Sequence, residues 1–196
     1  WFFMDEKHKI ACSLTGNIFY IKEMLLFKEM NNILICDVNA KLNEKGIWCN
    51  PSRCDIEKAI RNQAFDKILN KKLNILNYFT ESIESNLKLK ILNLLGLCKK
   101  AGLLEIGYDK VVKSLNNNNI DVVLIAKEDE KLNNIFLKKI EERKILLDKT
   151  FSRSDIGKAV GYKNVLCMGI VISNMSDKLK ADFYKLMRFQ LSKIIN

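Results

Sequence analysis

In the first third of the chain, short apolar runs alternate with polar or glycine-containing segments, a pattern typical of small strands joined by turns. The runs cover residues 17–21, 33–38 and 46–49. A helix follows them, because Ser52 and Asp55 have the spacing of a capping box, with Asp in place of the usual Glu, and apolar residues recur behind them at helical intervals. The pattern predicts a small ββ(β)α module over residues 1–72, followed by a connecting segment over 73–86.

From residue 87 onwards the chain alternates helical and strand patterns. Helical spacing of apolar residues covers 87–98, 107–115, about 130–143 and 152–161, and apolar runs of strand length cover 120–126, 145–147 and 165–172. Helices that connect strands allow neighbouring strands to run parallel and cover both faces of a sheet. We therefore predict an α/β chain whose second part, residues 87–172, is a three-layer αβα domain. Residues 173–196 form an amphipathic helix that we expect to pack on it.

The chain is basic. It has 33 Lys and Arg residues against 23 Asp and Glu residues, a net charge of +10, and no single segment carries most of it. Such a field raises the local concentration of polyanions, which favours nucleic acid as the partner. The alternative is that the lysines only solvate the surface.

Several classes of protein are disfavoured. No apolar stretch is long enough to span a membrane, and the apolar start is too short for a signal-peptide core, so we expect a cytoplasmic protein without a membrane partner, for which Met4 is an alternative start. His8 is the only histidine and lacks a nucleophilic partner, and phosphate-binding glycine loops are missing. We expect no enzyme activity and no cofactor.

The six cysteines lie partly within apolar runs, as reduced thiols do in cytosolic proteins. Cys49 and Cys54 flank a turn, and Cys12 precedes them, but Thr15 stands where a second Cys of a Cys-x-x-Cys pair would be. A structural zinc ion needs four ligands, so we expect no metal. Cys12, Cys49 and Cys54 are the residues that would hold zinc if the chain bound it.

Four motifs follow one another in the first module. They are Cys-Ser-Leu-Thr at 12–15, Met-Leu-Leu-Phe-Lys at 24–28, Ile-Cys-Asp at 35–37 and Glu-Lys-Gly-Ile-Trp-Cys at 44–49. In this order, over about residues 8–72, they resemble the bacterial YlxR family. The resemblance implies a strand at 24–28, nucleic-acid contacts by Lys45, Gly46 and Trp48, and a role in transcription, ribosome function or ribonuclease P.

Three further motifs occur in the second part, at residues 94–102, 107–113 and 155–161. They are similar to those of ribosomal proteins that bind kink-turns, in particular the YlxQ-like bacterial branch. The resemblance implies an αβα fold that meets RNA at the N-terminus of its second helix. Asp109 and Lys110 stand where the family has Asn and Glu, so we expect general rather than strictly kink-turn-specific binding. The candidate contacts are Lys99, Lys100, Gly107, Asp109, Lys110, Lys113, Lys158 and Gly161.

These observations predict a non-enzymatic RNA-binding accessory factor, with structured RNA and ribosome or ribonuclease P components as partners. Two alternatives stay open. The basic surface would also suit an adaptor that meets an acidic protein, and domains of the second type also serve as recognition modules of RNA-modifying enzymes.

Overall fold

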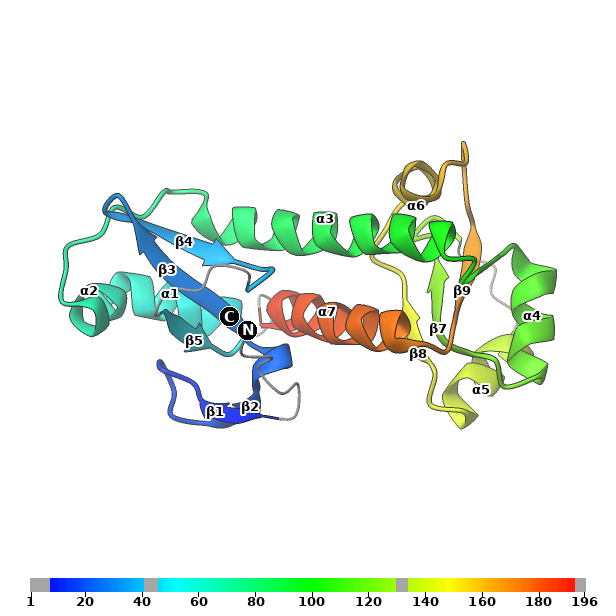
Figure 1. Ribbon diagram of the computed structural model, residues 1–196, viewed down its shortest axis with the longest axis horizontal. Helices are drawn as coiled ribbons and strands as arrows, with labels where there is room; N and C mark the ends of the chain where they lie inside the picture. Colours follow the sequence, from blue (N-terminus) through cyan, green and yellow to red (C-terminus); the bar gives the residue numbers. More distant parts are fainter. Residues whose placement is uncertain (1–7, 41–45, 130–133, 193–196) are drawn as a thin grey trace. The chain divides into compact units, whose positions relative to one another are not determined.

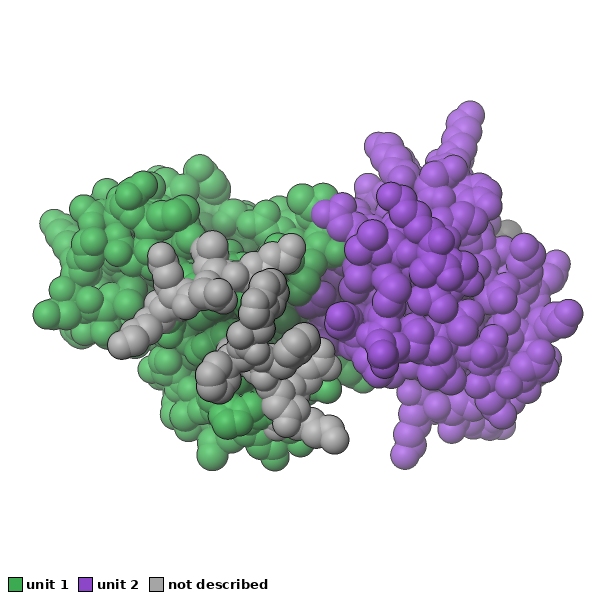
Figure 2. Space-filling model, in the orientation of Figure 1, with its two compact units in different colours: residues 1–90, 184–196 green, residues 91–183 purple. Residues whose placement is uncertain are grey.

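A computed structural model describes residues 8–40, 46–129 and 134–192 of the chain. The chain forms two compact units, shown in Figure 2: unit 1 comprises residues 1–90 and 184–196, and unit 2 comprises residues 91–183. The division falls within two helices, α3 (Phe79–Lys100) and α7 (Asn174–Leu191), each of which contributes residues to both units.

Unit 1 contains two small antiparallel sheets (Figure 1). The first is a hairpin of β1 (Lys9–Ala11) and β2 (Ile18–Tyr20), followed by a 3₁₀ turn at Ile21–Glu23. The second has the order β4-β3-β5, with β3 (Leu25–Met30) between β4 (Ile33–Asp37) and β5 (Ile47–Cys49). Two helices follow, α1 (Arg53–Arg61) and α2 (Ala64–Leu69).

The core of unit 1 is built around Phe27 in the central strand. Its ring lies 5.3 Å from that of Phe65 in α2 and 6.1 Å from that of Phe79 at the start of α3, and all three are buried. Gly46 lies against the same strand, because a Cβ atom there would come within 2.6 Å of Leu26 Cδ1 and 2.7 Å of the Phe27 carbonyl oxygen. Aromatic burial holds the sheet to the helices, and the missing side chain at Gly46 lets the chain before β5 approach β3.

Several local predictions for unit 1 are confirmed and others are wrong. Strands lie where the apolar runs predict them, and Ser52 caps α1 by accepting a hydrogen bond from the Asp55 amide. The single helix predicted up to residue 72 is wrong, because Gln63 adopts a left-handed conformation (φ 52°) that separates α1 from α2. The connecting segment predicted over 73–86 contains the first turns of α3, which begins at Phe79 and not at residue 87.

Unit 2 is built on a four-stranded sheet with the order β6-β9-β7-β8 (Figure 1). Its strands are β6 (Leu104–Ile106), β7 (Ile120–Ile125), β8 (Leu146–Asp148) and β9 (Cys167–Val171). The helices between them are α4 (Tyr108–Asn116), α5 (Asn134–Glu142) and α6 (Arg153–Val160). Only β7 and β8 pair in parallel, since β9 is antiparallel to both of its neighbours, so the expectation of parallel neighbours holds for one pair.

Both faces of this sheet are covered, which confirms the three-layer αβα prediction. On one face, Val123 and Ile125 of β7 pack with Val111 of α4 and with Phe136 and Ile140 of α5. Successive strand residues point to opposite faces, so the equally buried Val122 and Leu124 face the other layer. That layer contains α6 with the unit 2 parts of α3 and α7, whose Leu95, Ile156 and Leu179 are fully buried. No helix of the described residues is long and apolar enough to cross a membrane.

The start of α7 is tied to β7 by a polar network. Ser173 and Ser176 each accept a hydrogen bond from the other's amide through their hydroxyl oxygens. The Ser176 hydroxyl also lies 3.2 Å from Asp121 Oδ2, and Lys180 Nζ lies 2.6 Å from the same oxygen. Burial lowers the pKa of Lys180, but its bonds to Asp121 and Asp177 outweigh this effect and raise the pKa above its usual value. The lysine stays charged and the network stays intact at neutral pH.

We predict that Asp121→Ala destabilises the protein. The change removes a half-buried carboxylate that accepts bonds from both Ser176 and Lys180. We expect the free energy of unfolding, measured by urea denaturation, to fall by about 2 kcal/mol. The matched control is Asp177→Ala, which removes the exposed second partner of Lys180 and should cost less than about 1 kcal/mol. Equal losses in the two variants would contradict the structural role of Asp121.

Candidate nucleic-acid interface

The first element of the candidate site is the N-terminus of α4. Gly107 precedes the helix with φ 102° and ψ 148°, a backbone conformation that residues with a Cβ atom rarely adopt. Its amide donates to the Cys167 carbonyl over 3.0 Å, and its carbonyl accepts the Val111 amide over 3.1 Å. No side chain caps this helix, so its first amide groups point towards the surface without an intrahelical acceptor.

A cavity of about 580 Å³ opens beside this helix start, within unit 2. Two buried residues belong to its lining, Val165 just before β9 and Cys167 at the start of β9. Tyr108 and Leu166, which also line it, are about 40% exposed. Burial, and then the nearby carboxylate of Asp129, raise the pKa of Cys167 to about 12, so its thiol is neutral at physiological pH. The volume lies within the range of pockets that hold small organic groups.

Three polar side chains, Asp129, Arg153 and Asn164, also line the cavity. The Nε atom of Arg153 is buried and has no hydrogen-bond partner among the described residues, while the backbone amide of Arg153 donates to Glu128 Oε2 over 3.0 Å. The backbone of Arg153 is thus fixed at the start of α6, and its Nε donor is buried without a partner among the described residues. The cavity offers both acceptors and donors of hydrogen bonds.

The segment 161–166 that borders the cavity is held by α6. Ser152 and Asp155 form the predicted capping box, and the side chain of Ser152 contributes most to lowering the pKa of Asp155 below its usual value. At the other end, Gly161 ends the helix with φ 76°. The chain then folds back so closely that a Cβ atom on Gly157 would lie 2.7 Å from the Tyr162 carbonyl oxygen. The absence of a side chain at Gly157 thus fixes the path of the segment.

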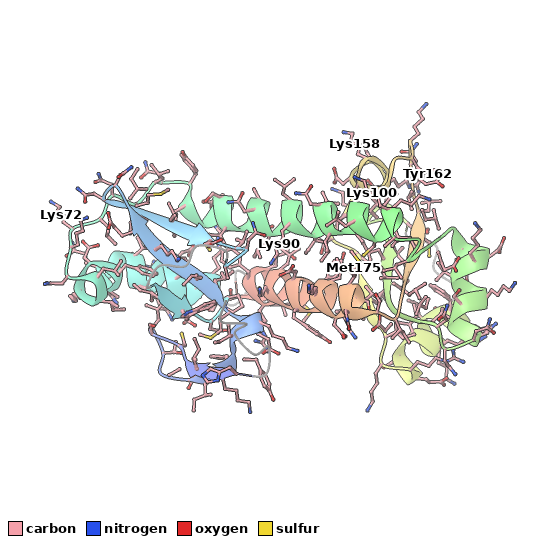
Figure 3. All side chains as sticks on the ribbon, in the orientation of Figure 1. Lys72, Lys90, Lys100, Lys158, Tyr162 and Met175 are labelled. Atoms are coloured by element: carbon pink, nitrogen blue, oxygen red, sulfur yellow. The ribbon has the colours of Figure 1, made fainter. Side chains whose placement is uncertain are left out.

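A second surface lies where α3 ends beside α6. We call it the α3–α6 surface; it comprises Lys99, Lys100, Lys158 and Tyr162. Lys99 Nζ lies 3.1 Å from the Tyr162 hydroxyl and 4.9 Å from the centre of its ring, and Tyr162 is 49% exposed. Figure 3 shows Lys100, Lys158 and Tyr162 on the same side of unit 2. The surface combines an accessible aromatic ring with three exposed cations.

The two helices of this surface pack closely. A Cβ atom on Gly96 would lie 3.0 Å from the Ala159 carbonyl oxygen, so the small residues of both motifs let the helix backbones approach. This contact explains physically why Gly96 and the Gly-Lys-Ala sequence at 157–159 occur in motifs that lie about sixty residues apart.

The unit 2 residues predicted from sequence fall into two groups. Gly107 lines the cavity, and Asp109, Lys110 and Lys113 lie on exposed turns of α4. Lys99, Lys100 and Lys158 belong to the α3–α6 surface, and Gly161 ends α6. Sequence reasoning missed Tyr108, Tyr162, Arg153 and Asn164. A signal for the tyrosines existed, because each directly follows a glycine that was singled out, Gly107 or Gly161.

The unit 1 candidates are placed differently. Gly46 is packed against β3, Trp48 is half-buried in β5 opposite Leu26, and Lys45 lies outside the described residues. The local packing explains Gly46 without any ligand. Met4 likewise lies outside the described residues.

The cysteines form no metal-binding group within the described part of the chain. Cys12 and Cys49 are buried and Cys54 is half-buried. Burial raises the pKa of Cys12, but hydrogen bonds from the Thr15 side chain and from the backbone, including the Asn50 amide at 3.2 Å from Sγ, lower it below its usual value overall. These bonds hold the turn at 12–16 against the residue after β5.

Residues 90–180 match a known family. Its description is ribosomal protein L7Ae/L30e/S12e/Gadd45 family. The match covers nearly all of unit 2 and lies outside residues 8–72, where the resemblance to the YlxR family stays a prediction.

Two solved structures are similar to part of the chain. A protein of unknown function from Bacillus halodurans C is 27% identical, with 47% of this chain and 95% of that chain covered and a TM-score of 0.43. The Giardia lamblia 15.5kD RNA binding protein is 14% identical, with 55% of this chain and 90% of that chain covered and a TM-score of 0.44. No curated protein matches the chain.

We predict that Gly157→Ala destabilises the protein, because the added methyl group meets backbone oxygens that cannot move independently. The expected cost is about 1–3 kcal/mol, measured as a lower midpoint of urea denaturation. Lys158→Ala, an exposed change on the same helix, is the control and should leave the midpoint nearly unchanged. A Gly157→Ala protein as stable as wild type would show that segment 161–166 is not held in this way.

Proposed function

We propose that unit 2 binds structured RNA through the N-terminus of α4 and the adjacent cavity. The observation that carries the proposal is the position of this cavity next to a helix start whose amides are not capped by a side chain. Such amides, at the positive end of the helix dipole, suit the phosphates of an RNA backbone. The cavity beside them suits a base.

The cavity has the properties needed for a nucleobase that leaves its helical stack. Tyr108 and Leu166 offer apolar surface, and the Tyr108 ring is supported by Phe136, whose ring centre is 4.9 Å away. Asp129 can accept hydrogen bonds from a base edge, while Arg153 and Asn164 can donate them. An RNA with an unpaired nucleotide flanked by helices would place a base and phosphates together in this way.

Phosphate contacts would come from Lys110 and Lys113 on α4 and from the α3–α6 surface. Tyr162 would stack on a further base or ribose there. Asp109 lacks the amide group with which an Asn donates to a base edge, so recognition would rest on RNA shape more than on sequence.

The family match supports this proposal, because the family is described by the names of ribosomal proteins. Together with the resemblance of the first module to the YlxR family, it favours a non-enzymatic, cytoplasmic accessory factor of transcription, ribosome function or RNA processing, with ribosome or ribonuclease P components as candidate partners. The alternatives are a protein adaptor and the recognition module of an RNA-modifying enzyme. Binding that persists after nuclease treatment would favour the adaptor.

The first test concerns charge. We expect the affinity for a kink-turn RNA, measured by fluorescence anisotropy, to fall steeply with salt concentration. Lys113→Ala should reduce the slope of log K against log salt concentration by about 0.9, the value for one phosphate contact. Lys72→Ala, an exposed lysine of unit 1, is the control. An affinity independent of salt, or an unchanged slope in Lys113→Ala, would contradict the proposal.

The second test concerns the cavity. Tyr108→Ala should weaken binding to the kink-turn RNA by about tenfold, while binding to a continuous duplex of the same stems changes little, because only the looped RNA supplies an unpaired base. Tyr184→Ala is a matched control, since both tyrosines are 41% exposed on a helix. Equal losses for looped and continuous RNA would exclude a base-binding role of the cavity.

A further inference from the structure

The outward face of the β1–β2 hairpin in unit 1 combines exposed apolar and basic side chains. The hairpin pairs Lys9 with Tyr20 and Ala11 with Ile18, and alternate residues of a strand share one face. All four are exposed, and Ile18 is 69% exposed. The opposite face carries Ile10 and Phe19, which are half-buried. The outward face is thus a small accessible platform and does not belong to the core.

Two cations lie beside the aromatic ring of this platform. Lys9 Nζ is 4.7 Å and Lys22 Nζ is 6.0 Å from the centre of the Tyr20 ring. Among the described residues, neither lysine has a carboxylate partner, and Glu23, the acid that follows Lys22, is held by Arg188 at 3.2 Å. The platform therefore has a net positive charge that its own described neighbours do not neutralise.

The hairpin is held in place at both ends. The Cys12 amide donates to the Asn17 carbonyl over 2.7 Å, and the Ser13 amide donates to the Trp48 carbonyl of β5 over 2.9 Å. At the open end, the Ile21 amide donates to the His8 carbonyl over 3.0 Å. Since Cys12 and Ile21 are also buried, the platform is formed before any partner arrives.

We propose that this platform binds a stretch of unpaired nucleic acid. Tyr20 stacks on one base, Ile18 contacts the neighbouring base or sugar, and Lys9 and Lys22 swing from the ring to the flanking phosphates. An accessible ring beside long, mobile cations is the combination that binds single strands without strict sequence preference. The complementary charge favours nucleic acid, and the flat ring beside the lysines distinguishes the platform from a simple basic patch. This site lies in the unit outside the family match and takes a different class of ligand from the proposed RNA site of unit 2.

The test uses the full chain and two short fluorescent probes, oligouridylate RNA and oligothymidylate DNA, followed by anisotropy. Tyr20→Ala should weaken binding of both probes by about tenfold, and Tyr20→Phe, which keeps the ring, should stay within about twofold of wild type. Lys9→Ala and Lys22→Ala should each reduce the salt slope by about 0.7. The matched controls in unit 1 are Tyr78→Ala, an exposed tyrosine with no lysine over its ring in the described part of the chain, and Lys72→Ala (Figure 3).

The outcomes separate this proposal from the proposed function. If Tyr20→Ala binds both probes with wild-type affinity, or if Tyr78→Ala loses as much affinity as Tyr20→Ala, the platform proposal is wrong. Loss of probe binding in Lys113→Ala but not in Tyr20→Ala would place single-strand binding in unit 2 and overturn it as well. Tyr20-dependent capture of a polyglutamate peptide in preference to both probes would identify an acidic protein surface as the ligand instead. Kink-turn RNA binding, measured in the same variants, tests the proposed unit 2 site separately, because it should fall more in Lys113→Ala than in Tyr20→Ala.

Discussion

The hydrogen bond from the Gly107 amide to the Cys167 carbonyl joins the two parts of the unit 2 site. It lies where β6 ends and β9 begins, and the antiparallel pairing of Ile106 with Met168 continues it into the sheet. Because of this register, the start of α4 and the segment 161–166 meet at one sheet edge although they are about fifty residues apart. The cavity between them is a consequence of strand pairing, and the two flanking glycines, Gly107 and Gly161, let the backbone turn sharply enough to leave it open.

Those parts of the fold that depend on local chemistry could be predicted from the sequence. The capping box at Ser152 and Asp155 and the apolar runs of β7 and β9 carry their own signals, because capping and burial act on neighbouring residues. β1 and β6 have three residues each, one of them charged, so no apolar run marks either strand. β1 exists through its pairing with β2 in the hairpin, and β6 through its pairing with the distant β9. Strand direction is likewise absent from a strand's own composition, which is why the mixed sheet of unit 2 was not predicted.

The start of α3 and part of the site likewise depend on distant contacts and not on neighbouring residues. Thr80, Ser82 and Ser85 disfavour a helix by propensity, yet Ile83 and Leu87 form a fully buried stripe along this turn, and burial outweighs propensity. The glycines and lysines of the site were found through the order of motifs. Arg153 and Asn164 were missed because membership of the cavity depends on how segment 161–166 folds over Gly157. Gly46 was interpreted as a contact residue, whereas its packing against β3 already accounts for a glycine there.

The charges around α4 restrict what the proposed site can bind. Asp109 lies in the first turn, where its carboxylate stabilises the helix dipole but also offsets the positive field at the amides. Asp129 adds a second negative group within the cavity, where it offsets the positive charge of Arg153. A free inorganic anion would therefore gain little in the cavity itself. A base edge with N–H donors gains from the Asp129 carboxylate, and its attached phosphates reach Lys110 and Lys113, which project outside the cavity on the exposed turns of α4. The distribution of charge thus favours a ligand that is neutral where it enters and anionic where it stays outside, which is the chemistry of a nucleotide within an RNA chain.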